Sequence, residues 1–213
     1  MADSTTREQI LDAAERLFAR RGFTRTTIKQ IGREAGVNSA LLYYYFGGKE
    51  QLYHEVLRRF VDRLASRTTA AAAAGDPVTA LRRFLQAQAE TLAANPHFPR
   101  LLVRELAESD AAHAVEPMQA LAATSFRRLC ELIEEGQRAG VFRRELDARY
   151  AAISTIAQLA YFYVARPALR ILLGTGPAGP GPDVARGFAH HAAEFALAAL
   201  AAPARRSGGA RRR

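Results

Sequence analysis

The sequence predicts an all-α protein. Alternation of apolar and polar residues over four to eight positions, the pattern of a half-buried strand, is scarce along the 213 residues. Alanine and leucine dominate the hydrophobic 49 % of the chain, and apolar residues recur three and four positions apart, which is the period of a helix with one buried face. No apolar run is long enough to cross a membrane, because arginine, glutamine or glutamate interrupts each one.

Two helices are expected at the start of the chain. The first covers residues 6–21, and Gly22 follows its end. Its apolar residues fall on one stripe: Ile10, Ala13, Ala14, Leu17 and Phe18. The second helix begins at the N-cap pair Thr26–Thr27 and stops at Gly36.

A third, very short helix is expected immediately after that turn. Asn38 or Ser39 caps it, and it runs through Tyr45. The glycine pair 47–48 then breaks the chain, and a long fourth helix starts at Lys49.

Five further helices are expected in the rest of the chain. They cover residues 77–94, 97–108, 116–138, 147–172 and 183–202. The fourth of these is expected to kink at Pro167, because proline cannot donate the backbone hydrogen bond of a helix interior. About nine helices are therefore predicted in total.

The composition predicts three regions. Residues 1–48 form an N-terminal three-helix, helix-turn-helix domain, and residues 49–202 form a C-terminal helical bundle. Residues 203–213 combine arginine and glycine with almost no apolar residue, so a disordered basic tail is expected.

The charge of the chain gathers at its two ends. The formal net charge is +9, and residues 61–202 hold 15 basic and 14 acidic residues, so that region is almost neutral. Residues 1–60 are basic by three charges, and the tail adds five arginines. A basic surplus indicates a polyanionic partner, although the tail alone fits a role in solubility equally well.

Other compositional features place the protein in the cytoplasm, at the nucleoid. The N-terminus lacks the charged and apolar regions of a signal peptide. The single cysteine, Cys130, excludes an internal disulfide and fits a reducing compartment.

The second and third helices have the geometry of a helix-turn-helix. Gly36 permits the tight turn between them, and their apolar residues pack against the first helix. The outer face of the third helix is then free to enter the major groove of DNA. Phosphates border that groove on both sides, so donors are needed on both flanks of the helix.

Residues 6–56 resemble the DNA-binding domain of the TetR family of bacterial transcriptional regulators. The resemblance covers about a quarter of the chain, and identities and spacing agree across four helices. The matching residues are Ala14, Leu17, Phe18, Gly22, Thr26, Thr27, Ile31, Ala35, Gly36, Val37, Ser39, Leu42, Tyr43, Tyr45, Phe46, Lys49, Glu50 and Leu52.

The resemblance implies DNA-binding roles for residues between Thr27 and Lys49, and this segment is called the recognition unit. Residues implied to contact phosphates are Thr27, Tyr43, Tyr45 and Lys49. Residues implied to read bases or to line the groove are Asn38, Ser39, Ala40, Leu41 and Tyr44, and Lys29 is implied to reach a base or a phosphate. Leu42 and Phe46 match core positions of the family.

The sequence departs from the family pattern at two of these positions. Ala40 stands where glycine or proline is frequent, and Leu41 stands where threonine is frequent. Leu41 cannot hydrogen-bond a base edge, although it fits against a thymine methyl group. The operator of the family therefore does not carry over, and Tyr44 is open to either a DNA contact or surface packing.

The resemblance also implies a homodimer that binds a palindromic, double-stranded DNA operator. A small-molecule effector is implied to move the fourth helix and so to release the homodimer from the operator. The expected interface is formed by the last two helices, 147–172 and 183–202. Its residues on the last helix are Ala185, Phe188, Ala189, Ala192, Phe195, Ala196 and Ala199, and an intramolecular core helix is the alternative for that helix. The expected pocket is lined by Phe84, Leu102, Glu105, Leu106, Phe126, Leu129, Ile133, Gln158, Tyr161 and Phe162. Glu105 either receives a polar ligand group or pairs with Arg100 or Arg104.

Two other classes of protein fit the sequence poorly. An enzyme is not indicated, because the chain has no phosphate-binding glycine loop, no nucleophile elbow and no metal-binding spacing of its five histidines. No cofactor or metal is therefore expected. An architectural DNA-binding protein would be basic along its whole length, whereas residues 61–202 are almost neutral.

Overall fold

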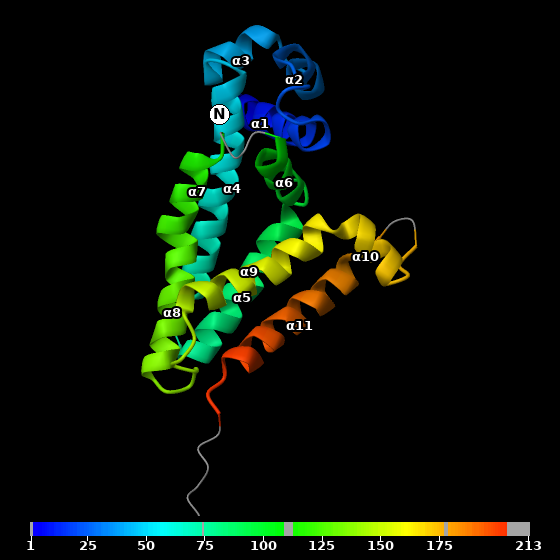
Figure 1. Ribbon diagram of the computed structural model, residues 1–213. Helices are drawn as coiled ribbons and strands as arrows, with labels where there is room; N and C mark the ends of the chain where they lie inside the picture. The colour runs from blue at the N-terminus through cyan, green and yellow to red at the C-terminus, as the bar shows by residue number, and fades with distance from the viewer. Residues whose placement is uncertain (1, 74, 109–112, 177–178, 204–213) are drawn as a thin grey trace, which may run out of the picture.

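The protein is all-α, as predicted. The structure, a computed structural model, describes residues 2–73, 75–108, 113–176 and 179–203, and this part contains eleven α-helices, one π-helical turn and no strand (Figure 1). The elements are α1 (Ala2–Arg21), α2 (Ile28–Ala35), α3 (Ser39–Phe46), α4 (Lys49–Ala71), α5 (Pro77–Ala94), α6 (Phe98–Glu108), α7 (Val115–Leu121), η1 (Ala122–Phe126), α8 (Arg127–Arg138), α9 (Ala148–Val164), α10 (Arg166–Leu172) and α11 (Pro182–Leu200).

The helices form a small unit joined to a larger bundle by α4. Figure 1 shows α1, α2 and α3 together at one end of the molecule, with α4 running from α3 into the bundle. There α4 packs along α5, α7 and η1, while α5 also contacts α8 and α11. Helix α6 lies against α1 on one side and α9 on the other, so it is a second link between the two parts.

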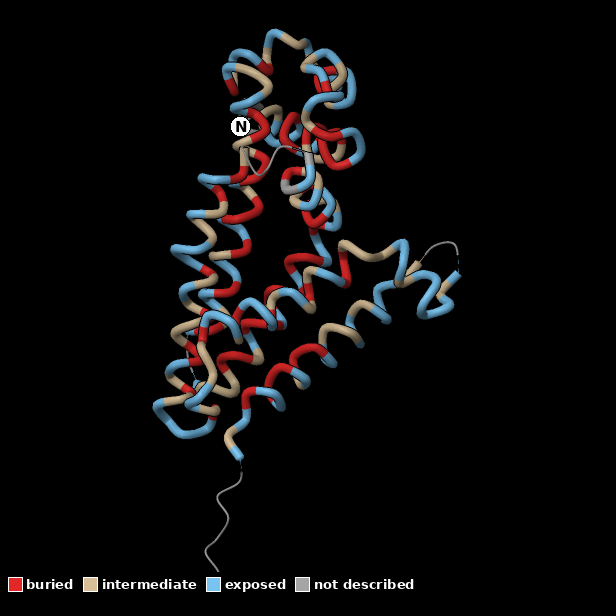
Figure 2. The backbone as a smooth tube through the Cα atoms, in the orientation of Figure 1, coloured by how far each residue is buried: buried red, intermediate tan, exposed pale blue. Residues whose placement is uncertain are grey.

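The buried core is continuous through both parts. One cluster of buried side chains extends from Ile10 of α1 through Leu52 and Phe60 of α4 to Leu200 of α11. Figure 2 shows buried segments on the inward side of each of these helices and exposed segments on the outward side. The boundary at residue 48 stays a prediction, since α4 supplies core residues on both sides of the junction.

The predicted helix 116–138 is one rod with a π-helical turn at its centre. At that turn the Arg127 N–H donates to the carbonyl of Ala122, five residues earlier. The hydroxyl of Thr124 also donates to the Ala120 carbonyl at 2.6 Å, and such side-chain bonding competes with the regular helical pattern. The rod is therefore divided into α7, η1 and α8.

The predicted break in helix 147–172 lies just before Pro167. Helix α9 begins at the N-cap Asp147, whose carboxylate accepts from the Arg149 N–H, and it ends at Val164. Pro167 lies in the first turn of α10, a position where its missing N–H costs nothing. Helix α1 differs from the prediction in starting at Ala2, four residues before residue 6, and the tail residues 204–213 lie outside the described residues.

A close contact fixes the far end of the bundle. Gly136 of α8 lies directly under the ring of Phe142, which is 2 % exposed, and a Cβ at Gly136 would overlap that ring. The segment around Phe142 is held to the end of α11 by two backbone hydrogen bonds. Arg143 N–H donates to Leu200 O at 2.8 Å, and Ala202 N–H donates to Val141 O at 2.9 Å.

We expect Gly136→Ala to lower the free energy of unfolding by about 1–3 kcal/mol, because overpacking outweighs the better helix propensity of alanine. Thermal or urea unfolding measures the effect. Phe142→Leu removes the ring that causes the overlap, so the double variant should be less destabilised than the sum of the single variants. Simple additivity of the two changes would contradict this account.

Candidate nucleic-acid interface and helical-core cavity

Helix α2 begins at a capping box and ends at a left-handed glycine, which starts the turn to α3. Thr27 is the N-cap of α2: its hydroxyl accepts from Gln30 N–H at 3.3 Å, and Gln30 Oε1 accepts from Thr27 N–H at 3.0 Å. Gly36 ends the helix with φ of 70°, a conformation that glycine adopts without steric cost. Thr26, the other member of the predicted cap pair, is buried and donates to Gly22 O at 2.7 Å.

Gly32 allows α3 to approach α2 closely. A Cβ at this position would lie 3.0 Å from the carbonyl oxygen of Val37 and 3.3 Å from the hydroxyl of Ser39. Val37 N–H in turn donates to Gly32 O at 2.9 Å. The sequence reasoning did not single out Gly32, although a glycine inside a helical pattern is a usual sign of close packing.

The inner side of this unit is buried. Ile31 of α2 and Leu42 of α3 are both 0 % exposed, and Phe46 is 6 % exposed. Their neighbours in the core include Leu17 and Phe18 of α1. Leu42 and Phe46 therefore hold α3 against the other helices of the unit, and the opposite side of α3 faces solvent.

The outer side of the unit presents most of the predicted DNA contacts. Thr27, Lys29, Asn38, Ala40, Tyr43 and Tyr44 are exposed, while Ser39, Leu41, Tyr45 and Lys49 are half-buried. Tyr43 and Tyr44 expose 57 % and 77 % of their surface, which is unusual for large aromatic side chains. The Tyr44 and Tyr45 rings meet edge to face with centroids 5.1 Å apart, so Tyr44 also packs on its neighbour.

Asn38 and Lys49 also have hydrogen-bond partners within the unit. Asn38 is the N-cap of α3, and its Oδ1 accepts from Ala40 N–H at 2.9 Å, which leaves its amide N–H groups for a ligand. Lys49 Nζ donates to the Phe23 carbonyl at 3.1 Å and lies 4.2 Å from the centroid of the Phe23 ring. Its ammonium keeps two further donors at the N-terminus of α4, where the helix dipole also favours an anion.

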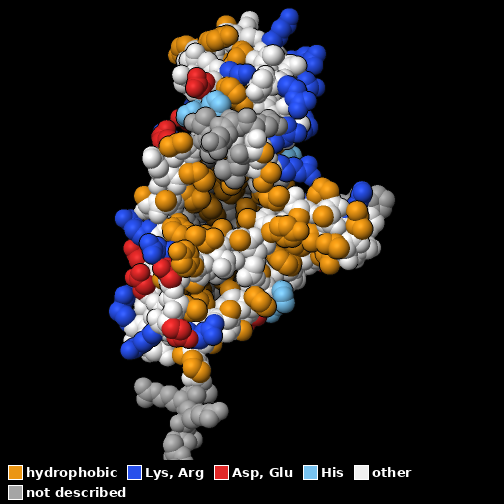
Figure 3. All heavy atoms as spheres, viewed as in Figure 1, with side chains coloured by type: hydrophobic (Ala, Val, Ile, Leu, Met, Phe, Trp, Pro, Cys, Tyr) orange, Lys and Arg blue, Asp and Glu red, His pale blue; other side chains and the backbone are white. Residues whose placement is uncertain are grey.

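A row of further basic residues borders α2. Arg21, Arg25, Lys29 and Arg33 are all exposed, and no ion pair joins them to a carboxylate within the described part of the chain. Arg16 and Arg20, in contrast, both pair with Glu34, whose pKa is lowered chiefly by the hydrogen bond from Arg20. Figure 3 shows this concentration of basic side chains on the small unit. Arg25 and Arg33 were missed by sequence reasoning, although Lys29 and Arg33 are one helical turn apart.

Glu105 forms a buried junction between the small unit and the bundle. It is 2 % exposed, and its carboxylate accepts from Tyr53 Oη at 2.9 Å and from His113 N–H at 2.7 Å. The His113 ring lies 3.1 Å from the same carboxylate and packs on Phe23 with ring centroids 4.4 Å apart. The contacts of this carboxylate thus lie at the junction rather than in a ligand cavity.

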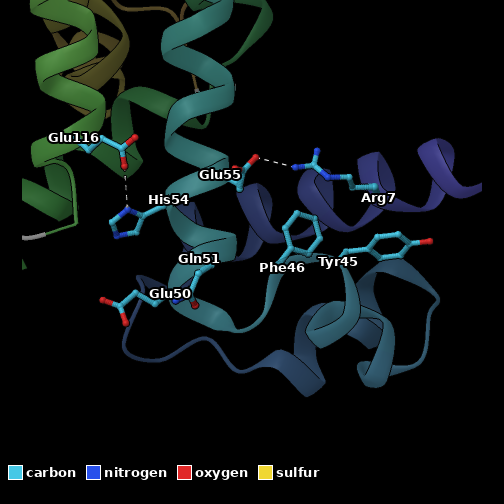
Figure 4. Close-up of a pocket in the computed structure, with 8 residues that line it drawn as sticks. All are labelled: Arg7, Tyr45, Phe46, Glu50, Gln51, His54, Glu55 and Glu116. Atoms are coloured by element: carbon cyan, nitrogen blue, oxygen red, sulfur yellow. Dashed lines mark hydrogen bonds and ion pairs between the residues drawn. The ribbon is translucent and has the colours of Figure 1, made fainter.

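A surface groove lies beside this junction (Figure 4). It is lined by Arg7, Tyr45, Phe46, Glu50, Gln51, His54, Glu55 and Glu116 and has a volume of about 360 Å³. His54 of α4 faces Glu116 of α7 at 4.0 Å, and Arg7 of α1 bonds Glu55 of α4 at 2.8 Å. Three carboxylates against one guanidinium make this groove a poor surface for phosphates.

A separate cavity of about 160 Å³ lies in the helical core. Its walls come from α4, α5, α7, η1 and α9: Leu64, Phe84, Gln88, Met118, Leu121, Ala122, Ser125, Phe126 and Ile156. Of the predicted pocket residues, Phe84 and Phe126 line it. No local pattern pointed to Gln88 or Ser125, because only tertiary packing brings them together.

The other predicted pocket residues lie elsewhere. Leu129, Ile133 and Phe162 are buried in the core, and the Phe162 ring stacks on Phe188 at 4.5 Å. Leu102 and Gln158 are half-buried, Tyr161 is 57 % exposed, and the Leu106 side chain lies outside the described residues.

The predicted interface residues of α11 divide between two sides of the helix. Ala192 and Ala196 are buried and Ala185, Phe188 and Ala189 are half-buried, and α11 packs on α5 and α9. Phe195 and Ala199 face solvent, together with Val184. Neighbouring α9 exposes a similar stripe of Tyr150, Ile153 and Tyr161.

Two general features of the described residues bear on the class of protein. No group of three or more histidine, cysteine, aspartate or glutamate residues in this part of the chain is arranged to hold a metal ion. No helix within it combines the length and apolarity needed to span a bilayer.

Comparisons with known proteins agree with the geometry of both parts. Residues 10–56 match the family model of bacterial regulatory proteins, tetR family, and residues 77–180 match that of the tetracyclin repressor-like C-terminal domain. The HTH-type transcriptional repressor NicS of Pseudomonas putida is 35 % identical over 163 residues, covering 74 % of this chain and 75 % of NicS. The HTH-type transcriptional repressor KstR2 of Rhodococcus jostii is 31 % identical over 150 residues, covering 70 % and 73 %.

A solved structure shows the same fold over almost the whole chain. The TetR family transcriptional regulator PfmR of Thermus thermophilus superposes with a TM-score of 0.72 at 26 % identity, over 90 % of this chain and 98 % of PfmR. The chain belongs to the TetR family of bacterial regulatory proteins, which are DNA-binding transcriptional regulators and not enzymes.

Proposed function

We propose that the protein is a homodimeric repressor that binds a palindromic operator through α3 and releases it when a small molecule enters the helical core. The observation that carries the proposal is the outer side of α3, where Tyr43 and Tyr44 are exposed while Leu42 and Phe46 anchor the same helix. Repression is supported by the relatives, since NicS and KstR2 are both described as repressors. Acting on chromosomal DNA, the protein would work in the cytoplasm at the nucleoid.

The recognition unit suits a helix held in the major groove. Residues Asn38 to Leu41 open α3 and would face base edges, where the N-terminal part of a recognition helix makes its contacts. Tyr43, Tyr45 and Lys49 on one side and Thr27, Lys29 and Arg33 on the other would hold phosphates.

The exposed apolar stripes of α9 and α11 support dimerisation through these helices. Tyr150, Ile153 and Tyr161 lie on one helix, Val184 and Phe195 lie on the other, and the two helices pack side by side (Figure 1). A contiguous exposed apolar face of this kind marks an interaction site. A two-fold axis through it would pair α9 and α11 with their copies in a four-helix interface.

The core cavity is placed to influence the recognition unit. Met118 and Leu121 of α7 line the cavity, while Glu116 at the other end of α7 faces His54 of α4. His113, two residues before α7, bonds Glu105 at the junction. A ligand that favours another position of α7 would therefore shift α4 and change the spacing of the two recognition helices.

The direct test is selection of genomic DNA fragments by the purified protein, followed by a mobility-shift assay. We expect a specific, palindromic site whose binding weakens with salt, because phosphate contacts release counterions. Binding without sequence preference at every salt concentration would contradict an operator-specific repressor.

Substitutions on the recognition unit should separate charged from neutral contacts. The logarithm of the operator association constant falls as the logarithm of the salt concentration rises. Lys49→Gln and Arg33→Ala should each make this negative slope shallower by about 0.9 per lost phosphate contact, and so by about 1.8 per dimer. Tyr43→Phe removes a neutral donor, so we expect roughly tenfold weaker binding with an unchanged slope. Fluorescence anisotropy at several salt concentrations measures both quantities.

The matched control is Arg127→Ala on α8. Arg127 is an exposed arginine paired with Glu131 on α8, and Figure 1 shows α8 in the bundle, away from α2 and α3. Its replacement should leave both affinity and slope unchanged. Equal effects of Arg127→Ala and Arg33→Ala would show that overall charge, rather than the proposed contacts, governs binding.

A charge on the α9–α11 face should separate the dimer. We expect Phe195→Asp to shift the protein to monomer in analytical ultracentrifugation and to weaken operator binding at least tenfold, since an unpaired carboxylate would be buried at the interface. Val115→Asp places the same charge on an exposed apolar residue of α7 and should leave the dimer intact. A dimer that survives Phe195→Asp would move the interface to another face.

A further inference from the structure

The chemistry of the core cavity indicates which kind of molecule it takes. Its volume of about 160 Å³ is close to that of an engineered cavity known to hold benzene, roughly 150 Å³. The ligand would therefore be compact, with about one six-membered ring and a small substituent. Long chains and fused ring systems exceed this space.

The cavity wall provides no partner for a charge. None of the nine lining side chains is ionisable, and seven of them are hydrophobic. A carboxylate or an ammonium group would lose its hydration here without gaining an opposite charge. The lining therefore selects an uncharged molecule.

Gln88 brings an unused hydrogen-bond acceptor to this apolar wall. Its side chain lines the cavity, the residue is 5 % exposed, and its Oε1 is buried without a hydrogen-bond partner. Buried polar atoms of native proteins are nearly always paired, so a lone acceptor at a cavity indicates that a ligand completes it. A ligand hydroxyl both donates and accepts, so it satisfies the carboxamide in either orientation.

Ser125 adds a second acceptor on the π-helical wall. Thr68 Oγ1 lies 2.8 Å from Leu64 O and 2.9 Å from Ser125 Oγ. Either hydroxyl can donate in the Thr68–Ser125 pair, and in both directions Ser125 Oγ keeps at least one lone pair as an acceptor. Ser125 belongs to η1, and π-helical turns are frequent at functional sites.

The larger hollow on the bundle has a different character. A groove of about 480 Å³ lies between α5 and α11 and is lined in part by Arg82, Glu90, Arg186 and His190. Arg82, Glu90 and Arg186 each pair with an opposite charge, and Arg186 and His190 are exposed. Among the described residues that line this groove, none carries a buried side-chain oxygen or nitrogen without a hydrogen-bond partner, whereas Gln88 does so in the core cavity. The core cavity therefore carries the inference.

We infer that the effector is a compact, uncharged, mostly apolar molecule whose one hydroxyl or N–H donor is bound by Gln88. This inference rests on the proposed function, because it names the class of the effector that would release the operator. The donor of the ligand bonds Gln88 Oε1, and its apolar body contacts Leu64, Phe84 and Ile156. Met118, Leu121 and Phe126 close the cavity on the side of α7 and η1.

Four probes of nearly equal size test the inferred chemical class of the effector, by isothermal titration calorimetry on the full-length protein. Benzyl alcohol is uncharged and has one donor, toluene lacks the donor, and benzoate and benzylamine carry a charge at neutral pH. We expect benzyl alcohol to bind about tenfold more tightly than toluene, as one neutral hydrogen bond to a buried acceptor allows. Benzoate and benzylamine should show no binding at millimolar concentration.

Two variants locate the binding. Gln88→Leu should abolish the preference for benzyl alcohol over toluene while keeping toluene binding, because shape is retained and the acceptor is lost. Ile156→Trp should fill the cavity and abolish binding of both, with circular dichroism confirming that each variant is folded. Any of four results would overturn the inference. They are tighter binding of benzoate than of benzyl alcohol, equal binding of benzyl alcohol and toluene, no binding of any probe, and a preference for benzyl alcohol that survives Gln88→Leu.

Operator binding by the same samples separates this inference from the proposed function. A protein that binds its operator but shows none of the expected probe selectivity contradicts the ligand class alone. A protein that binds benzyl alcohol as expected but no DNA contradicts the repressor function and leaves the cavity chemistry standing.

Discussion

The structure depends on α4, a single helix that connects the recognition unit, the Glu105 junction and the core cavity. Lys49 is its first residue, Tyr53 lies one turn later at the Glu105 junction, and Leu64 lines the core cavity. With a rise of 1.5 Å per residue, roughly 22 Å of regular helix separate Lys49 from Leu64. In the proposed mechanism, a shift of α4 at the cavity would therefore reach Lys49 through continuous helix, without an intermediate loop.

The Glu105 carboxylate makes this connection specific. A buried carboxylate must be hydrogen-bonded, because its transfer from water is otherwise very costly. Glu105 obtains its bonds from Tyr53 of α4 and from His113 before α7, and Phe23 packs on the rings of both partners. Movement of α7 away from α4 would leave this carboxylate short of partners, so the junction favours discrete positions over gradual sliding.

Local patterns were enough to predict the recognition unit, whereas the cavity and the interface depended on tertiary packing. The glycine turn at Gly36 follows from short-range spacing, and the core positions of Leu42 and Phe46 follow from the family resemblance. The structure has all three as expected. Gln88 and Ser125 lie 37 positions apart, and nothing in either local pattern indicates that they share a cavity. The small residues of α11 look alike in sequence, and only the packing of α5 and α9 decides which are covered.

The composition of the proposed recognition face limits how it can read DNA. Asn38 uses its side-chain oxygen to cap α3, so only its amide N–H groups are left, and these suit an acceptor such as guanine O6 or N7. Ala40 and Leu41 offer only apolar contact, which distinguishes thymine by its methyl group. With so few base-specific hydrogen bonds, phosphate contacts from the basic row must supply much of the affinity, and the sequence-dependent shape of the DNA must supply much of the discrimination. The spacing of the two recognition helices then matters more than any single base contact, and that spacing is what a ligand acting through α4 would change.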